Sequence, residues 1–202
     1  MEEQKSSCNA EAESLTADNG KYSVPAKNTS RTLRLTRIAV VAALYIALTW
    51  AAGFMSFGPF QFRISEALTI LPLFGWEYVA ALTVGVFLSN TISWFGIIDM
   101  FLGALATLIA AVLTRLSRKI YLGVIPPIVV NALIVPIIII VGSDYGMSSY
   151  WFFVMTVGLG QTAVLLTLGV LLYFVIRKNK KLYEIVANRA LSKEIRTTKI
   201  EY

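Results

Sequence analysis

The stretch FGPFQFRISEAL, residues 57–68, places Arg63 and Glu66 three positions apart, shortly after a Gly-Pro pair. Between residues 38 and 114 the chain is almost wholly apolar, and only Glu77 and Asp99 are charged besides these two. Ionisable groups are costly inside a bilayer, so they usually line cavities or pair with one another. This stretch therefore indicates a junction between membrane spans and, at the same place, a candidate functional position.

The composition around this stretch is that of a membrane protein. Of the 202 residues, 56% are hydrophobic and 15% are charged, and the mean hydropathy is +0.68. Soluble domains carry about 25% charged residues. There is no histidine, and Cys8 is the single cysteine. These facts exclude a disulfide within the chain and the usual zinc sites built from histidine and cysteine, and we expect no metal and no cofactor.

Two polar tails flank the predicted membrane domain, residues 31–178. Residues 1–30 are rich in Ser, Glu, Asn, Ala and Lys and contain no apolar run. They are expected to form a disordered cytoplasmic tail rather than a signal peptide. Residues 179–202 are basic, and they are expected to form a second cytoplasmic tail that can be helical.

Four apolar runs approach the length of about 20 residues that a helix needs to cross a bilayer. They are residues 38–57, 97–113, 121–141 and 150–176. Residues 64–95 are too long for one span and short for two, so a break at FGWEY, residues 74–78, is expected to divide them into two short helices. The predicted fold is an all-α integral membrane bundle of six transmembrane helices.

The basic residues predict the orientation of this bundle. They form three clusters: Arg31, Arg34 and Arg37; Arg115, Arg118 and Lys119; and Arg177, Lys178, Lys180 and Lys181. With six spans all three clusters lie on one side, which the positive-inside rule makes cytoplasmic. With five spans the second and third clusters would face outside. Both termini are therefore expected in the cytoplasm, and so is the Glu77 turn, although no basic residue stands beside it in the sequence.

Polar residues gather in the outer half of the predicted bundle. They comprise Glu66, Asn90 and Asp99 at the outer ends of three spans, Asn131 and Gln161 near mid-depth of the last two, and Trp94 and Trp151 at the outer edge. Convergence of such groups predicts a pocket for a planar, hydrogen-bonding solute.

Structural roles for the same residues stay open. Arg63 and Glu66 have the i, i+3 spacing of a local ion pair, and Asp99 has a place where a helix dipole stabilises a negative charge. Asn90, Asn131 and Gln161 have side chains that hydrogen-bond between membrane helices in many proteins.

The first span carries alanine at every fourth position: Ala39, Ala43, Ala47 and Ala51. On a helix these residues form one smooth stripe. Small residues at this spacing let another helix approach closely in lipid. The stripe is expected either to bind another protein or to pack within the same chain.

No enzyme motif is present in the sequence. It contains no HExxH, no Gly-x-Ser-x-Gly and no Gly-x-x-x-x-Gly-Lys loop, which excludes the corresponding metalloprotease, hydrolase and phosphate-binding sites. We therefore expect a non-enzymatic membrane component without a nucleic-acid partner. If the protein pumps a solute, other subunits must hydrolyse ATP.

Three segments resemble the QueT family of substrate-binding (S) components of energy-coupling factor transporters, which import queuosine precursors. The segments are FGPFQFRISEALTILPLF (57–74), PPIVVNALIVP (126–136) and VGLGQTAVLLTLGVLLYFVIRK (157–178), and the resemblance covers residues 33–178. It implies a multi-pass plasma-membrane S component of six helices. Such a component binds its solute from outside and works with a transmembrane coupling subunit and two cytoplasmic ATPases. The family commonly has an acidic residue at the position of Gln161, so this sequence departs from the family pattern there.

This resemblance implies roles for the polar residues. The Glu66 carboxylate would accept paired donors from a 7-deazaguanine base, Asp99 would meet the ammonium of an aminomethyl precursor, and Arg63 would brace the outer loop. The other residues would bridge or stack on the base: Asn90, Asn131, Trp94, Trp151 and Gln161. The alanine stripe would dock on the coupling subunit. An S component for another vitamin, and a structural or signalling membrane protein without a solute, remain the alternatives.

Overall fold

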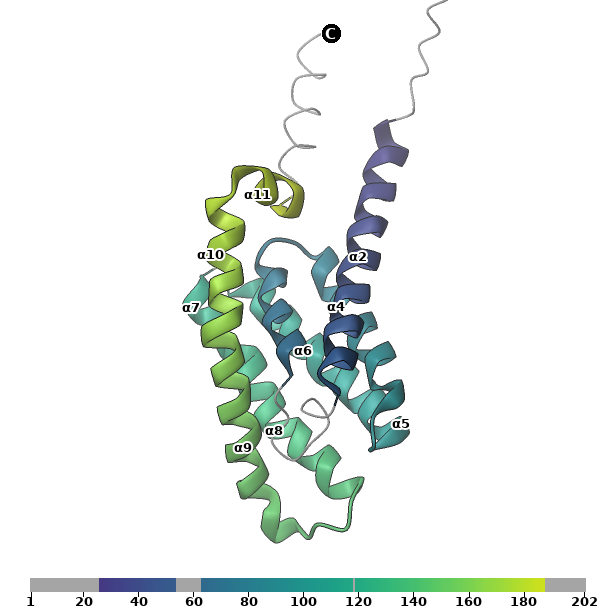
Figure 1. Ribbon diagram of the computed structural model, residues 1–202, viewed down its shortest axis with the longest axis vertical. Helices are drawn as coiled ribbons and strands as arrows, with labels where there is room; N and C mark the ends of the chain where they lie inside the picture. Colours follow the sequence, from purple (N-terminus) through teal and green to yellow (C-terminus); the bar gives the residue numbers. More distant parts are fainter. Residues whose placement is uncertain (1–25, 54–62, 118, 188–202) are drawn as a thin grey trace, which may run out of the picture. The chain divides into compact units, whose positions relative to one another are not determined.

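The computed structural model describes residues 26–53, 63–117 and 119–187 (Figure 1). These residues are helical apart from turns and contain no strand, which confirms the all-α class. The chain divides into two units, Met1–Leu33 and Arg34–Tyr202, and every contact given below lies within the second. Most of the predicted N-terminal tail, the Gly-Pro turn and the end of the C-terminal tail fall outside the described residues, but helix begins already at residue 26.

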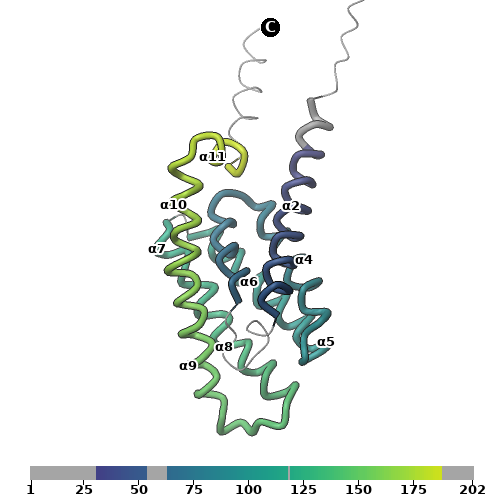
Figure 2. Tube along the Cα trace, in the orientation of Figure 1, coloured from purple at the N-terminus to yellow at the C-terminus, as the bar shows by residue number. Residues whose placement is uncertain are grey.

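From η1 onward the described helices follow one another with short connections. In chain order they are α2 (Ala26–Ala51), η1 (Ile64–Leu73), α4 (Glu77–Ser89), η2 (Asn90–Ile92), α5 (Gly96–Ile98), η3 (Asp99–Gly103), α6 (Ala104–Leu116), α7 (Ile120–Gly123), α8 (Ile125–Val141), η4 (Met147–Ser149), α9 (Tyr150–Val164), η5 (Leu165–Gly169), α10 (Val170–Lys178) and α11 (Lys180–Ala187). η3 and η5 are π-helical, whereas η1, η2 and η4 are 3-10 helices. Figures 1 and 2 show α9, η5 and α10 as one continuous rod that leads into α11.

Four described helical stretches are long and apolar enough to cross a membrane: Arg31–Ala51, Gly96–Leu116, Ile120–Val141 and Met147–Lys178. They correspond to the four long runs predicted from the sequence, with their ends displaced by a few residues. Two shorter apolar stretches, Ile64–Leu73 and Glu77–Ile92, lie where a divided segment was predicted. A break is confirmed within the predicted residues 74–78, but it is shorter: η1 ends at Leu73 and α4 already begins at Glu77, which leaves residues 74–76 between them.

η1 is enclosed by other helices. Its residues from Ser65 to Pro72 are all buried, and it packs against α4, α6, α9 and α10. A segment surrounded by protein needs no polar face, so its sequence, ISEALTILPL, is apolar except where Ser65, Glu66 and Thr69 hydrogen-bond. Because η1 is surrounded in this way, Glu66 lies in the interior.

A buried core joins α2, η1, α4 and α10. It contains Tyr45, Leu71, Leu82 and Val86 together with Ile176, and α11 packs on it through Leu182, Tyr183 and Val186. α2 and α4 approach closely because Gly85 faces Ala42: a Cβ at Gly85 would lie 3.4 Å from the Ala42 backbone. Ala42 therefore faces the interior of this unit.

Two arginines hold the turn between η1 and α4. Arg37 Nη1 lies 3.5 Å from Glu77 Oε1, and Arg115 Nη1 donates to the carbonyl oxygen of Leu73 over 3.0 Å. The Arg115 guanidinium also lies 5.8 Å from the centre of the Trp76 ring. The turn, which has no basic neighbour in the sequence, thus receives its positive charge from α2 and α6.

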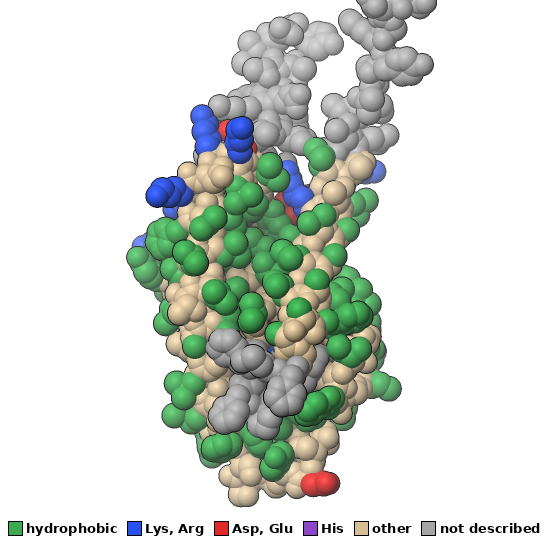
Figure 3. Space-filling model, viewed as in Figure 1, with side chains coloured by type: hydrophobic (Ala, Val, Ile, Leu, Met, Phe, Trp, Pro, Cys, Tyr) green, Lys and Arg blue, Asp and Glu red, His purple; other side chains and the backbone are tan. Residues whose placement is uncertain are grey.

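The surface seen in Figure 3 is sharply divided. Hydrophobic side chains are spread along the whole visible flank, and Lys and Arg side chains gather at the end where α10 meets α11. A broad apolar flank with charge at its end is the pattern of helices surrounded by hydrocarbon.

A buried carboxylate cluster beside a small cavity

Glu66 lies in the first turn of η1 and is only 3% exposed. Three uncharged side chains from three other helices donate to its carboxylate. Tyr45 Oη lies 2.6 Å from Oε1, and the amide nitrogens of Gln161 and Asn131 lie 3.0 Å and 3.3 Å from Oε2. A carboxylate, with two acceptor oxygens, suits such a set of donors.

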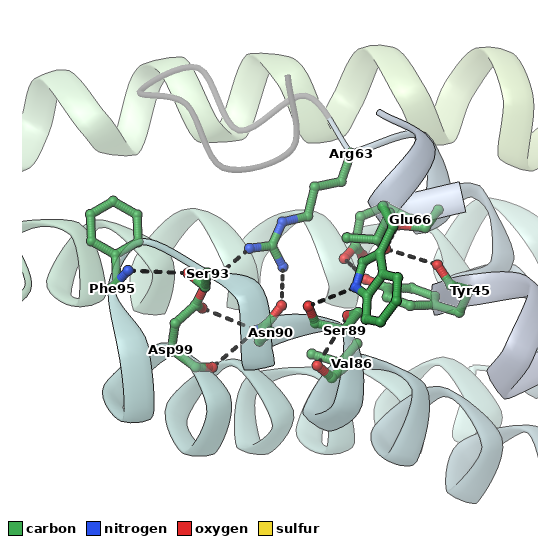
Figure 4. A network of polar contacts seen from close by, with 12 residues as sticks. Tyr45, Arg63, Glu66, Val86, Ser89, Asn90, Ser93, Phe95 and Asp99 are labelled. Carbon is green, nitrogen blue, oxygen red and sulfur yellow. Dashed lines mark hydrogen bonds and ion pairs between the residues drawn. The ribbon is translucent and has the colours of Figure 1, made fainter. Parts of the chain in front are cut away.

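A second cluster lies next to the first and surrounds Asp99 (Figure 4). Arg63 Nη2 lies 3.4 Å from Asp99 Oδ2, and Arg63 Nη1 donates to Asn90 Oδ1 over 3.3 Å. The Asn90 amide in turn donates to Asp99 Oδ1 over 3.1 Å and to its backbone carbonyl over 3.0 Å. Ser93 donates a short hydrogen bond to Asp99 Oδ2.

The local backbone explains how Asp99 reaches this position. η3 is a π-helical turn at the start of the α6 span, and such turns recur at functional sites. Gly103 closes this turn against Asn90: a Cβ there would lie 2.6 Å from Asn90 Nδ2 and 3.0 Å from Asp99 Oδ1. Only glycine fits without displacing the Asn90 side chain.

We expect Gly103→Ala to destabilise the protein by about 1–3 kcal/mol, the usual cost of overpacking a filled interior. The added methyl group would push the Asn90 amide away from both of its Asp99 acceptors. Thermal unfolding in detergent measures the change. Gly158→Ala is the matched control, since a Cβ there meets Ala132 Cβ at an ordinary 3.5 Å. Equal unfolding temperatures for the two variants would show that the Asn90–Asp99 contact does not contribute to the stability of the protein.

The two clusters border a cavity of about 20 Å³, whose polar walls include Arg63, Glu66, Asp99, Asn131 and Gln161. Its other walls are Gly103, Thr107, Val135 and Val157. A volume of this size holds about one water molecule, whereas pockets for drug-sized ligands measure about 300–1,000 Å³. A bicyclic base therefore enters only if the side chains around the cavity move.

The structure brings together five of the predicted site residues: Glu66, Asn90, Asp99, Asn131 and Gln161. It also gives Arg63 a more distant partner than the sequence suggested. Arg63 pairs with Asp99, 36 positions along the chain. Its ion pair is therefore with a distant helix rather than a local i, i+3 pair with Glu66. Arg63 thus fastens the start of η1 to η3, while the loop it was predicted to brace lies outside the described residues.

Trp94 and Trp151 do not line the cavity. Their side chains are 69% and 70% exposed, and the Trp151 ring packs edge-on against Tyr150, with ring centres 5.3 Å apart. Stacking of either indole on a solute stays a prediction, and it requires a rearrangement of the described structure.

Tyr45 is the chief site residue that the sequence analysis missed. It is fully buried and ties α2 to Glu66, and Thr49, one turn further on, bonds to Ser65 Oγ over 2.7 Å. The sequence did contain a pattern that could have identified Tyr45. Tyr45 and Thr49 stand four positions apart in an otherwise apolar run. That spacing marks one helix face on which both hydroxyl groups lie.

The alanine stripe lies on another face of α2. Its four members, Ala39, Ala43, Ala47 and Ala51, are all exposed in this chain. By contrast Ala42, Tyr45 and Thr49 of the same helix are buried. The alternative that the stripe packs within the chain therefore does not hold for the described residues.

Apolar helices that enclose a charged cluster and a cavity form the kind of site at which a membrane protein binds a solute or an ion. Residues 35–178 match the QueT transporter family, which identifies the class of protein. The chain belongs to the QueT transporter family and is a multi-pass protein of the plasma membrane.

One curated relative is the Queuosine precursor transporter QueT of Lactococcus lactis subsp. cremoris (strain MG1363). The two sequences are 43% identical over 82 residues, which is 40% of this chain and 48% of the relative. The match thus spans about half the length of that relative. No solved structure matches the chain.

Proposed function

We propose that this chain is the solute-binding component of an ATP-driven importer of the energy-coupling factor type, and that it binds a queuosine precursor of the 7-deazaguanine type from outside. Family membership and the name of the Lactococcus relative support the substrate class. The observation that carries the proposal is the Glu66 carboxylate, buried beside a cavity and held by donors from α2, α8 and α9.

A 7-deazaguanine base suits these groups. One edge of the base presents a ring N–H and an amino group, and the two oxygens of a carboxylate accept such donors in pairs. The base then takes the place of the Asn131 and Gln161 amides at Glu66. Each freed amide keeps one donor group and one acceptor group for the remaining edges of the ligand.

Binding by the purified protein tests this function directly. A panel of queuine, its 7-deazaguanine precursors, folate, thiamin and riboflavin is titrated against the full chain in detergent. We expect saturable binding of the deazaguanines alone. Binding of one of the vitamins instead would identify an S component of another specificity. A stable protein that binds none of them would favour a structural or signalling role.

We further propose that the chain crosses the membrane six times, with both termini in the cytoplasm. The four long helices supply four crossings, and η1 with α4 supplies the other two. The Arg37–Glu77 pair and the Arg115–Leu73 contact support this count. Both arginines belong to basic clusters that the positive-inside rule assigns to the cytoplasm, so the η1–α4 turn belongs to the same side.

Cysteine labelling in sealed cells checks this topology. The native Cys8 and a Ser192→Cys substitution in a Cys8→Ser background are both expected to resist a membrane-impermeant reagent. Ser148→Cys in the same background is the positive control, because the segment between α8 and α9 is then outside. Labelling of Cys8 or of residue 192 in intact cells would contradict the six-span arrangement.

The proposed partners are a transmembrane coupling subunit and two cytoplasmic ATPases. The chain has no phosphate-binding Gly-x-x-x-x-Gly-Lys loop, so in an ATP-driven importer the ATP would be hydrolysed by other subunits. The exposed stripe of Ala39, Ala43, Ala47 and Ala51 is the proposed contact with the coupling subunit, because small residues allow close helix packing in lipid.

A further inference from the structure

The bend between α10 and α11 is formed by one residue, Asn179. Its backbone is extended, with φ −91° and ψ 106°, whereas α10 ends at Lys178 and α11 begins at Lys180. The Asn179 side chain stabilises the bend, because its Oδ1 accepts a hydrogen bond from the backbone nitrogen of Leu182 over 3.3 Å, as an N-cap residue does. The chain therefore changes direction at a defined position.

This bend brings two lysines to one groove. Positions i and i+2 of a continuous helix do not face the same side, so Lys178 and Lys180 would be separated if α10 continued. With Asn179 extended, both lysines line one open groove of about 510 Å³, together with Val175 and Asn179 itself. Neither lysine forms an ion pair with another residue that the structure describes.

The packing of α11 keeps the groove in shape. Leu182, Tyr183 and Val186 pack on the buried core, and Tyr78 Oη donates to the Val186 carbonyl oxygen over 2.9 Å. The Tyr183 ring also meets the Phe74 ring edge-on, with ring centres 6.1 Å apart. α11 is thus fixed to the bundle along its apolar face, which leaves its lysines at the surface (Figure 3).

The groove lies at the end of a membrane span. The stretch Met147–Lys178 is long and apolar enough to cross a bilayer, so Val175 belongs to the span and Lys180 follows it. Val175 is apolar and 49% exposed. The groove therefore offers two ammonium groups and, next to them, an exposed aliphatic side chain at the boundary between hydrocarbon and water.

We propose that this groove binds the headgroup of an anionic phospholipid. The ammonium groups of Lys178 and Lys180 contact the phosphate, and Val175 contacts the apolar part of the lipid below it. Basic residues just outside a membrane span attract anionic headgroups, whereas a soluble polyanion has no apolar part for Val175. The groove shares no residue with the solute cavity, so this inference does not depend on the proposed solute.

Two lipids with identical acyl chains test the proposal: phosphatidylglycerol, which is anionic, and phosphatidylcholine, which is zwitterionic. Native mass spectrometry of the delipidated full chain in a neutral detergent gives the ratio of their affinities. We expect phosphatidylglycerol to bind about 30-fold more tightly, about fivefold for each of the two lysines. Inorganic phosphate should not displace it, because phosphate lacks the apolar part.

Two double variants, each of which removes two positive charges, test whether the groove is the site. Lys178→Gln combined with Lys180→Gln should bring the ratio close to one. Arg177→Gln combined with Lys181→Gln is the matched control, because both residues are exposed neighbours that do not line the groove. This control should keep most of the wild-type ratio.

Equal binding of the two lipids by the wild-type protein would overturn the proposal. Equal losses in the two double variants would show diffuse attraction by the whole basic end and would overturn a defined site. Displacement by inorganic phosphate would identify a site for free anions and contradict the lipid assignment. If the groove double variant does not fold, Lys178→Gln or Lys180→Gln alone decides. Each should lower the ratio about fivefold, and an unchanged ratio contradicts the proposal.

Discussion

Glu66→Gln is expected to lower the affinity for a queuosine precursor by about 30-fold or more, since losing a charged hydrogen bond in a dry pocket costs about 2–5 kcal/mol. Glutamine keeps the volume of the side chain but replaces one acceptor with an amino group. That group would face a donor of the ligand, and in the unliganded protein it would face a donor of Tyr45, Asn131 or Gln161.

Calorimetric titration of the folded variant measures this loss. Glu77→Gln is the matched control, because Glu77 is also a buried glutamate, 9% exposed, but pairs with Arg37 away from the cavity. It is expected to lower stability and leave ligand affinity unchanged. A well-folded Glu66→Gln protein that binds like the wild type would remove Glu66 from the binding site and leave it a structural residue.

The second large effect is expected at the alanine stripe. Ala43→Leu or Ala47→Leu should abolish assembly with the coupling subunit, because a branched side chain prevents the close helix contact that alanine permits. Solute binding by the isolated protein should survive, since both residues are exposed and lie away from the buried face with Tyr45 and Thr49.

Co-purification of the partner subunits and uptake of a labelled precursor measure this effect. Ala163→Leu makes the same substitution at an exposed alanine on α9 and should leave assembly intact. Normal co-purification and uptake in both α2 variants would show that the partner binds another surface. Loss of assembly in Ala163→Leu as well would show that leucine disturbs the membrane helices in general.

The sequence was sufficient for the membrane class, the four long apolar helices and the break between η1 and α4. Each of these depends on properties of neighbouring residues: hydropathy summed over about 20 positions, and the interruption of an apolar run. It was sufficient also for the charged and amide residues of the cluster, because such side chains are conspicuous in an apolar run, but not for Tyr45.

The partners of those polar residues were decided only by tertiary structure. Spacing alone allowed an Arg63–Glu66 pair, whereas the packing of η1 between other helices directs Arg63 to Asp99 and gives Glu66 to Tyr45. The partner of each polar side chain depends on which faces of distant helices pack together. A single sequence does not show which faces these are.

Tertiary structure likewise decided which side of α2 is buried. Ala42 and Tyr45 face inward while Ala43 and Ala47 stay exposed, although all four belong to one apolar run. In a lipid-facing helix both sides are apolar, so periodic hydrophobicity, which orients helices in water, gives no direction. Close packing of Ala42 against Gly85 and the hydrogen bond from Tyr45 to Glu66 provide that direction instead.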